Sequence, residues 1–292
     1  MPNTLQAFDA TKFSAKVVER LDPLTLMLAF ANRDYDGDLT ENSTVKIRSV
    51  GDITLTPYVK GVTSLSSQDL AATSEDLTVT DASSFQFAVE DIDVRQNDLS
   101  AMDLYARRAA VAVADAIEKK LASQYTKAFA ANQITGAAGA NIAITKDNVY
   151  DQFVLAAERL NTQNNSGADR WMIVDPKTAS AVALSPLLTR STAMGDAIVS
   201  GNTAQGGARV NQLIGNIAGF TTYWSNYAPA AGGARFLIYG QGQPMNYAGQ
   251  IVETEMFRSQ SAFATVMRGL LLHDATVLNE NKKKIGTIKV AP

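Results

Sequence analysis

The stretch FQFAVEDIDVRQNDLSAMDLYARRAAVAVADAIEKKLASQYTKAFAAN, residues 85–132, changes its hydrophobic period once. Over residues 85–96, apolar side chains alternate with polar ones, which is the pattern of a half-buried β-strand. Over residues 97–132 there is neither glycine nor proline, and apolar or alanine side chains recur at steps of three and four. At 1.5 Å per residue, a helix from 97 to about 131 is about 50 Å long, several times the usual length. The stretch therefore predicts a strand that leads into one very long helix.

The acidic residues at this junction, Glu90, Asp91 and Asp93, have two interpretations. A pair of carboxyl groups can act as general acid and general base. Acidic side chains also stabilise the positive end of a helix dipole, and these stand directly before the predicted helix. The second interpretation is favoured, because no other catalytic motif accompanies them.

The segment before the strand reads as an arm and a long hairpin. Residues 1–31 carry apolar side chains at helical spacing, and so short an arm cannot bury that face alone. Residues 44–82 contain strand-like runs on either side of VTSLSSQDLAATSEDL, which is small and polar. A polar excursion of this length is uncommon inside a compact domain. It is either a mobile surface loop or an arm that reaches a partner.

The remainder mixes helices and strands without a repeated βαβ unit. The pattern predicts a helix over 147–162, a buried strand RWMIV at 170–174, and a helix that begins at Asp175-Pro176. A loose loop is expected over 190–208. Further strands are expected within 215–229, at 234–240 and over 251–279. This order predicts the α+β class.

Composition excludes several classes of protein. The chain has 292 residues, 46% of them hydrophobic and 19% charged, which is enough apolar material for a core. The net charge of −3 gives no bulk attraction to nucleic acid or anionic membranes. Cysteine is absent, so disulfides, thiol catalysis and thiolate metal sites are excluded. No apolar run is long enough for a spanning helix, and the start lacks the order of a signal peptide, so we expect a soluble protein made in a cytoplasm.

Motifs that carry chemistry are also missing. The nucleotide-binding, lipase-type and zinc-protease motifs GxGxxG, GxxxxGK[ST], GxSxG and HExxH do not occur. The single histidine, His273, has no supporting nucleophile motif and is interpreted as structural. NRDYDGDLTEN, residues 32–42, resembles the first half of a calcium loop, but its twelfth position is Ser43 and no second helix is predicted. We therefore predict a polar turn there, and no catalytic, cofactor or metal site anywhere.

The basic run Lys282–Lys284 near the end has two interpretations. It contacts nucleic acid or an acidic neighbour, or it is a solvated tail. The tail is favoured, because aromatic residues are not interleaved with the basic ones as in a platform for single strands.

The order of these motifs resembles the major capsid proteins of tailed double-stranded-DNA bacteriophages, which have the Hong Kong 97 fold. ANRDYDGDLTENSTVKI is similar to the family's turn that leads into a V-x-I strand. FAVEDIDVRQ resembles the entry into the spine helix, and RWMIVDPKTASAVAL the strand, proline and helix of the axial domain. GNIAGFTTYWSN resembles the axial hairpin, and RGLLLHDATVLN the closing strands of the peripheral domain.

The resemblance implies an α+β subunit with four parts. These are an N-terminal arm (1–45), an extended loop (46–82), a peripheral domain with the spine helix (83–145 and 245–292) and an axial domain (146–244). The loop at 190–208 is expected near the local symmetry axis. The residues expected at subunit contacts are Phe13, Val17, Tyr58, Lys60, Leu65, Arg107 and Arg108.

The implied function is structural rather than enzymatic. Copies of the chain form hexamers and pentamers that tile an icosahedral shell around phage double-stranded DNA, which lies close without specific binding. The implied partners are a portal, a scaffolding protein and decoration proteins, with no membrane and no cofactor. Because the arm begins almost at Met1, scaffolding is expected to be a separate protein, unless none is needed. The implied location is the virion, after assembly in the host bacterial cytoplasm. Some members crosslink a lysine of the extended loop, but nothing local marks Lys60 as reactive, and the crosslink is not expected.

Two alternatives stay open at this point. One is an encapsulin-like nanocompartment, a cellular shell of similar fold that holds an enzyme instead of DNA. The other is a hydrolase with paired Asp and Glu residues, which predicts small oligomers with a cleft instead of closed particles.

Overall fold

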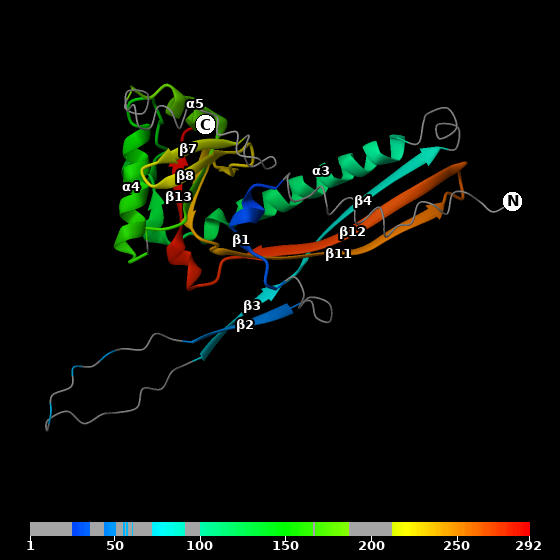
Figure 1. Ribbon diagram of the computed structural model, residues 1–292, viewed down its shortest axis with the longest axis horizontal. Coiled ribbons are helices and arrows are strands. Elements are labelled where there is room, and N and C mark those ends of the chain that lie inside the picture. Colours follow the sequence, from blue (N-terminus) through cyan, green and yellow to red (C-terminus); the bar gives the residue numbers. More distant parts are fainter. Residues whose placement is uncertain are drawn as a thin grey trace.

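The computed structural model describes residues 25–35, 44–50, 55, 57, 60, 72–90, 100–165, 167–186 and 212–292. In these residues the strands form a four-stranded, a seven-stranded and a two-stranded sheet. A long sheet and one long helix extend side by side from a more compact α/β unit, and a hairpin projects from the region where the two meet (Figure 1). The mixture of helices and sheets agrees with the predicted α+β class.

The long sheet is built on a β-hairpin. Strand β11 (Met245–Arg258) pairs antiparallel with β12 (Ala264–Thr276), and β12 pairs antiparallel with β4 (Asp81–Glu90). The short β1 (Ala31–Asn32) adds to β11 in parallel, so the order is β1-β11-β12-β4. The predicted alternation of 85–90 and the strands predicted over 251–279 are confirmed.

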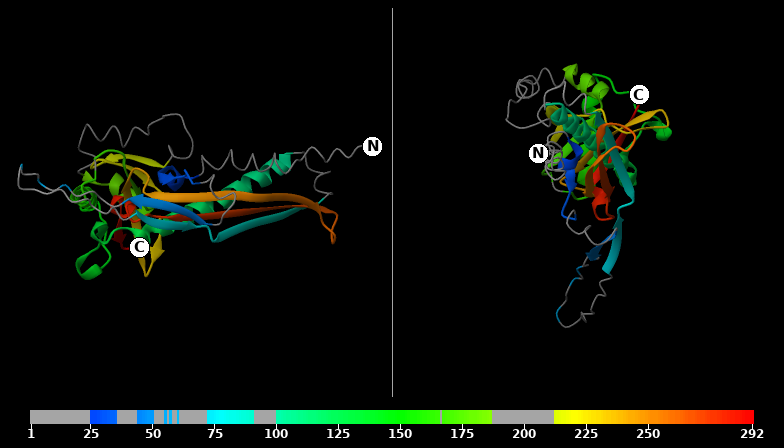
Figure 2. Two further views of the ribbon diagram at one scale, coloured as in Figure 1. Left: turned by 90° about the horizontal axis from the view of Figure 1, so that it is seen from below. Right: turned by 90° about the vertical axis from the view of Figure 1, so that its right-hand side faces the viewer.

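Helix α3 (Ser100–Ser123) covers one face of this sheet, as Figures 1 and 2 show. The small side chains of Ala109 and Ala110 pack on Met267 of β12, together with Phe85 and Phe87 of β4. Further along, the buried stripe of α3 packs with Leu271 and Ala275. Its members are Val113, Ile117, Leu121 and Ala122.

The end of the long helix was predicted wrongly. The α-helix stops at Ser123, and two 3₁₀ turns follow, η4 (Gln124–Lys127) and η5 (Ala130–Asn132). Between them Ala128 and Phe129 leave the helical region. The buried Asn132 donates to the carbonyl groups of Lys283 and Ile285. The segment after Ser123 contains no glycine or proline, so contacts with residues distant in sequence, and not a local helix breaker, accompany its change of direction. The predicted start at 97–99 lies outside the described residues.

The α/β unit contains the seven-stranded sheet. The short β5 (Gln133–Ile134) and β9 (Ala230–Ala231) accompany β6 (Arg170–Val174) and β10 (Ala234–Gln241). The order is β5-β13-β10-β6-β8-β7, with β9 on β10. The other strands are β7 (Leu213–Ile217), β8 (Phe220–Trp224) and β13 (Ile285–Val290), and the remaining 3₁₀ turns are η6 (Ala137–Gly139) and η7 (Asn281–Lys284).

Two helices accompany this sheet, as predicted. The apolar stripe of α4 (Val149–Thr162) buries Phe153 and Leu160 in a core shared with the sheet. Helix α5 (Pro176–Ala183) has proline in its first turn and Asp175 as its N-cap, whose carboxylate accepts from the Thr178 N–H at 3.1 Å. Such a cap satisfies one of the amide groups that a helix leaves unpaired at its start.

The predicted hairpin is present, with a correction to one strand. β2 (Thr44–Val50) pairs antiparallel with β3 (Ala72–Thr78). The last part of the run VTSLSSQDLAATSEDL, which was predicted to be a polar excursion, is therefore a strand. Pairing with β2 and burial of Leu77 override the poor strand propensity of its Ser, Asp and Glu residues. Residues 61–71 lie outside the described part.

The N-terminal segment is fixed to both units. The turn η2 (Met27–Phe30) is tied to α3 by the Met27 N–H, which donates to the buried carboxylate of Glu118 at 2.8 Å. Phe30 stacks on Trp171 of β6, with ring centroids 4.5 Å apart. Residues 1–24 and the predicted loop at 190–208 lie outside the described residues.

The predicted domain boundaries stay a prediction. The pairing of β5 and β13 within the seven-stranded sheet is a feature that those boundaries did not include. Among the described residues, no helix is both long enough and apolar enough to cross a membrane.

The close approach of Phe85 to Gly269 yields a test of the long sheet. A Cβ atom at Gly269 would stand 2.4 Å from the Phe85 ring, which α3 and the sheet hold in place. We expect Gly269→Ala to lower the free energy of unfolding by about 1–3 kcal/mol, as overpacking does. Urea unfolding followed by circular dichroism measures this. Gly167→Ala is the matched control, because a Cβ there meets no atom within 4 Å, and equal midpoints for the two variants would contradict the packing.

Candidate functional site

Among the described residues, the ionisable side chains do not form a catalytic constellation. His273 on β12 is buried, and its Nε2 lies 3.3 Å from the Ser83 hydroxyl oxygen. The neighbouring Asp274 is held by other groups, so no serine, histidine and aspartate act in series. The described residues contain no cluster of acidic and histidine side chains that could hold a metal. At the described start of the candidate calcium loop, the Asp34 N–H donates to the Asn32 side chain at 2.9 Å, which forms a polar turn, and residues 36–43 lie outside the described residues.

The most connected polar group is a clamp formed by Lys120, Asp81, Asp274 and Thr80. The Lys120 ammonium contacts Asp81 Oδ2 at 2.7 Å and Asp274 Oδ1 at 2.9 Å. The second oxygen of Asp274 accepts from the Thr80 N–H at 3.3 Å and from the Thr80 hydroxyl at 3.0 Å. The clamp thereby joins α3, β12 and the chain between β3 and β4.

The charges of the clamp stabilise each other. Burial by itself raises the pKa of Asp274, but hydrogen bonds from Lys120, Ala275 and Thr80 outweigh burial and hold this pKa below its ordinary value. Burial by itself lowers the pKa of Lys120, and the bonds to Asp81 and Asp274 raise it above its ordinary value. Both groups are therefore charged at neutral pH.

The β2–β3 hairpin stands away from the rest of the molecule (Figures 1 and 2). In the described part of the hairpin, the root packs on the long sheet through Ile47, Leu77 and Ala248 of β11. The Glu75 carboxylate also accepts from the Asn279 N–H, at 3.0 and 3.1 Å. Beyond the root, Leu55 is 96% exposed. Because a two-stranded hairpin is marginal in water by itself, this element needs an external surface.

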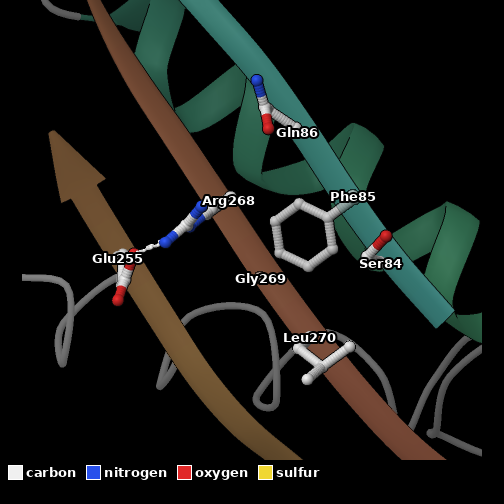
Figure 3. A pocket seen from close by; sticks show the side chains of 7 residues that line it. All are labelled: Ser84, Phe85, Gln86, Glu255, Arg268, Gly269 and Leu270. Atoms are coloured by element: carbon white, nitrogen blue, oxygen red, sulfur yellow. Dashed lines mark hydrogen bonds and ion pairs between the residues drawn. The ribbon is translucent and has the colours of Figure 1, made fainter. Parts of the chain in front are cut away.

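A second exposed surface lies on the long sheet, on the face opposite α3. Arg268 and Leu270 alternate along β12 with Met267 and Leu271, which pack against α3. An open groove runs across this face, with Gly269 in its floor (Figure 3). Its lining residues are Ser84, Phe85, Gln86, Glu255, Arg268, Gly269 and Leu270.

Exposed aromatic side chains lie beside this groove, at Phe257, and in the turn at the end of the sheet, at Phe263. Arg268 donates to Glu255 at 2.7 Å and lies 5.2 Å from the centre of the Phe257 ring. Phe263, in the turn between β11 and β12, is 84% exposed. An exposed ion pair of this kind contributes little to stability. The sheet thus presents aromatic side chains together with an arginine, residue types that are enriched at protein contacts.

The sequence-predicted contact residues are only partly placed. Arg108 is exposed on α3, and Lys60 is an exposed turn residue. Arg107 belongs to α3, but its side chain lies outside what is described. The other four also lie outside the described residues: Phe13, Val17, Tyr58 and Leu65.

The sequence did not predict the clamp or the exposed Phe263 in the turn between β11 and β12. The available signal for the clamp was a histidine and an aspartate in GLLLHDATVL, because consecutive polar residues in an apolar strand have to be satisfied. The tri-lysine run is solvated as expected, with Lys283 and Lys284 exposed, but it is not a tail. It forms η7 between two strands, and the Lys283 carbonyl accepts from Asn132 and Asn165.

His273 yields a prediction of pH dependence. Burial lowers the pKa of His273 from 6.5; the charges facing it are Asp81, Lys120 and Asp274, and the Tyr247 ring lies alongside. As the pH falls through 6.5, the unfolded chain takes up a proton that the folded chain resists, so stability falls. We expect this loss in the wild type, at most about 1.4 kcal/mol per pH unit, and not in His273→Gln. Urea unfolding between about pH 7.5 and about pH 5.5 measures it, and equal slopes would contradict the assignment.

Comparisons with known proteins agree with the geometry. The sequence profile of a family described as "Phage capsid protein" matches residues 74–280, more than half of the chain. No significant match is found among curated protein sequences.

Solved structures show the same fold over nearly the whole chain. The structure of Mycobacterium phage Che8 is 24% identical, with a TM-score of 0.65, and the match covers 90% of each chain. The capsid of Cyanophage P-SCSP1u is 17% identical, with a TM-score of 0.66 over 91% of this chain and 88% of that chain. A virus-like particle from Pyrococcus furiosus is 10% identical, with a TM-score of 0.55 over 96% and 98%.

These likenesses confirm the Hong Kong 97-like α+β fold. The alternative of a cellular shell has the weaker support, because the particle from Pyrococcus furiosus is the less similar in identity and TM-score. The chain therefore belongs to the phage capsid protein family, and it is a structural protein of a capsid shell.

Proposed function

We propose that the chain is the major capsid protein of a tailed double-stranded-DNA bacteriophage, assembling as hexamers and pentamers into an icosahedral shell around the genome. The observation that carries the proposal is the projecting hairpin, whose described residues pack on the subunit at the root, in a chain of the capsid family. A hairpin already formed in the subunit can bind a neighbouring copy without a further ordering cost for its paired strands.

The exposed apolar side chains support contacts between copies. Leu55 on the hairpin segment and Phe263 at the end of the long sheet are 96% and 84% exposed. Several contacts of this kind per subunit bury a large total area, while each stays weak enough to be reversible during assembly. The net charge of −3 suits a container that encloses DNA without binding it tightly.

The roles of the parts follow from this function. Residues 1–45 act as an arm and 46–82 as the extended loop, while α3 is the spine of a peripheral domain and 146–244 form the axial domain. A portal, a separate scaffolding protein and decoration proteins are the further partners. The subunits assemble in the host cytoplasm, reside in the virion and catalyse no reaction.

Electron microscopy tests the proposal. We expect the protein, expressed alone or with a phage scaffolding protein, to form closed particles in negative stain, and particles from infected cells to contain long DNA. Particles that enclose an enzyme instead would favour the nanocompartment, and small species under all conditions with hydrolytic turnover would favour the hydrolase.

The hairpin contact has its own test. Leu55→Asp places a charge on a side chain that a neighbour buries, and we expect a several-fold loss of particles without a change in subunit stability. Dynamic light scattering and thermal unfolding measure the two effects. Leu55→Met keeps an apolar side chain and is expected to assemble normally; normal assembly of Leu55→Asp would exclude this contact.

A further inference from the structure

We propose that Lys120 and Asp274 are positioning residues for assembly, which set the direction in which the β2–β3 hairpin projects. They act on the joint Val79–Thr80, the only residues between the end of β3 at Thr78 and the start of β4 at Asp81. The inference rests on the proposed function, because the direction of the hairpin matters only where neighbouring copies bind it.

The joint is short and connects two different sheets. β3 belongs to the two-stranded sheet and β4 to the long sheet. A change in the backbone dihedral angles of Val79 and Thr80 therefore swings the whole hairpin relative to the long sheet, as hinge residues do.

Asp274 holds this joint in one conformation. The ladder between β12 and β4 ends at His273 and Asp81, so Asp274 lies beside Thr80. One Asp274 oxygen accepts from both the N–H and the hydroxyl of Thr80, at 3.3 and 3.0 Å. Its own position is fixed by the Ala275 N–H, which donates to the other oxygen at 2.7 Å.

Lys120 ties the joint to α3. Its ammonium bridges Asp274 and Asp81, which stand on β12 and directly after the joint. The side chains of Lys120 and Asp274 are 20% and 12% exposed, so water screens this pair less than a surface pair. The direction of the hairpin is thereby coupled to the position of the helix.

The remaining contacts of the root have a different effect. The cluster of Ile47, Leu77 and Ala248 packs the root, with Val79 of the joint against it, and the bond from Asn279 to Glu75 attaches β3. Apolar contact is non-directional, whereas hydrogen bonds require particular distances and angles. The apolar cluster therefore holds the root in place, and the hydrogen bonds of the clamp and of Glu75 restrict its angle, those of the clamp acting at the joint.

The absence of cysteine makes the angle measurable, because introduced cysteines carry spin labels without background. The pair Ser74→Cys and Gln86→Cys spans the joint, with both positions exposed. Gln86→Cys with Glu158→Cys is a control pair that does not span it. Electron paramagnetic resonance distances are measured in unassembled subunits, in the background of each clamp variant.

We expect one narrow distance distribution for the wild-type pair across the joint. Lys120→Met is expected to broaden or shift it, with the control pair unchanged and a several-fold loss of particles. Lys120→Arg retains the charge and is expected to restore both readouts. Lys119→Met is the matched control, because the neighbouring lysine pairs with Asp115 and not with the clamp.

A second, milder variant keeps the test interpretable if Lys120→Met does not fold. Thr80→Val removes only the hydroxyl bond at the joint and is expected to broaden the distribution less than Lys120→Met. An unchanged distribution in both variants overturns the positioning role, and altered distances with normal particle yield overturn its role in assembly. Wild-type protein that forms no particles contradicts the proposed function, while the distances still decide whether the clamp sets the angle.

Discussion

The packing of α3 on the long sheet is the constraint on which the other features depend. The sheet of β11, β12 and β4 has one apolar face, and a helix of matching length covers it with alanine, valine, isoleucine and leucine side chains. Alanines on the helix and Gly269 on the sheet allow close approach, with the Phe85 ring filling the space above the glycine. Because both the helix and the strands of the sheet are long, the apolar face of this sheet can be buried by one helix without a compact globular core around it.

The same arrangement leaves surfaces that the chain does not cover itself. A sheet with a helix on one face exposes the other, and the described part presents there the groove of Figure 3 and the aromatic side chains beside it. The hairpin extends the molecule further in another direction (Figure 2). Such surfaces are useful in a shell protein, because each subunit has to contact several neighbouring subunits while its own interior stays unchanged.

Local patterns predicted many elements because their causes are local. Helix α4 follows from its apolar stripe, α5 from the Asp-Pro start, and β6 from the apolar run after Arg170, a strand that the structure buries over its whole length. Predictions failed where distant residues decide. The helix ends early because Asn132 binds the turn at Lys283, and β3 forms from a polar run because β2 pairs with it. The contact residues were chosen from arms and exposed basic positions, and most of them lie outside the described residues.

The α+β class, the order of the main elements and the absence of cysteine chemistry follow from the amino-acid sequence alone, because periodicity, turn residues and composition are read from the sequence directly. It also carried enough family pattern to indicate a capsid protein. By contrast, the meeting of Lys120, Asp81 and Asp274 at the root of the hairpin and the position of Phe85 over Gly269 are visible only in the folded chain. These contacts join residues far apart along the chain, and strand register, which sets such partners, depends on the packing of the whole sheet.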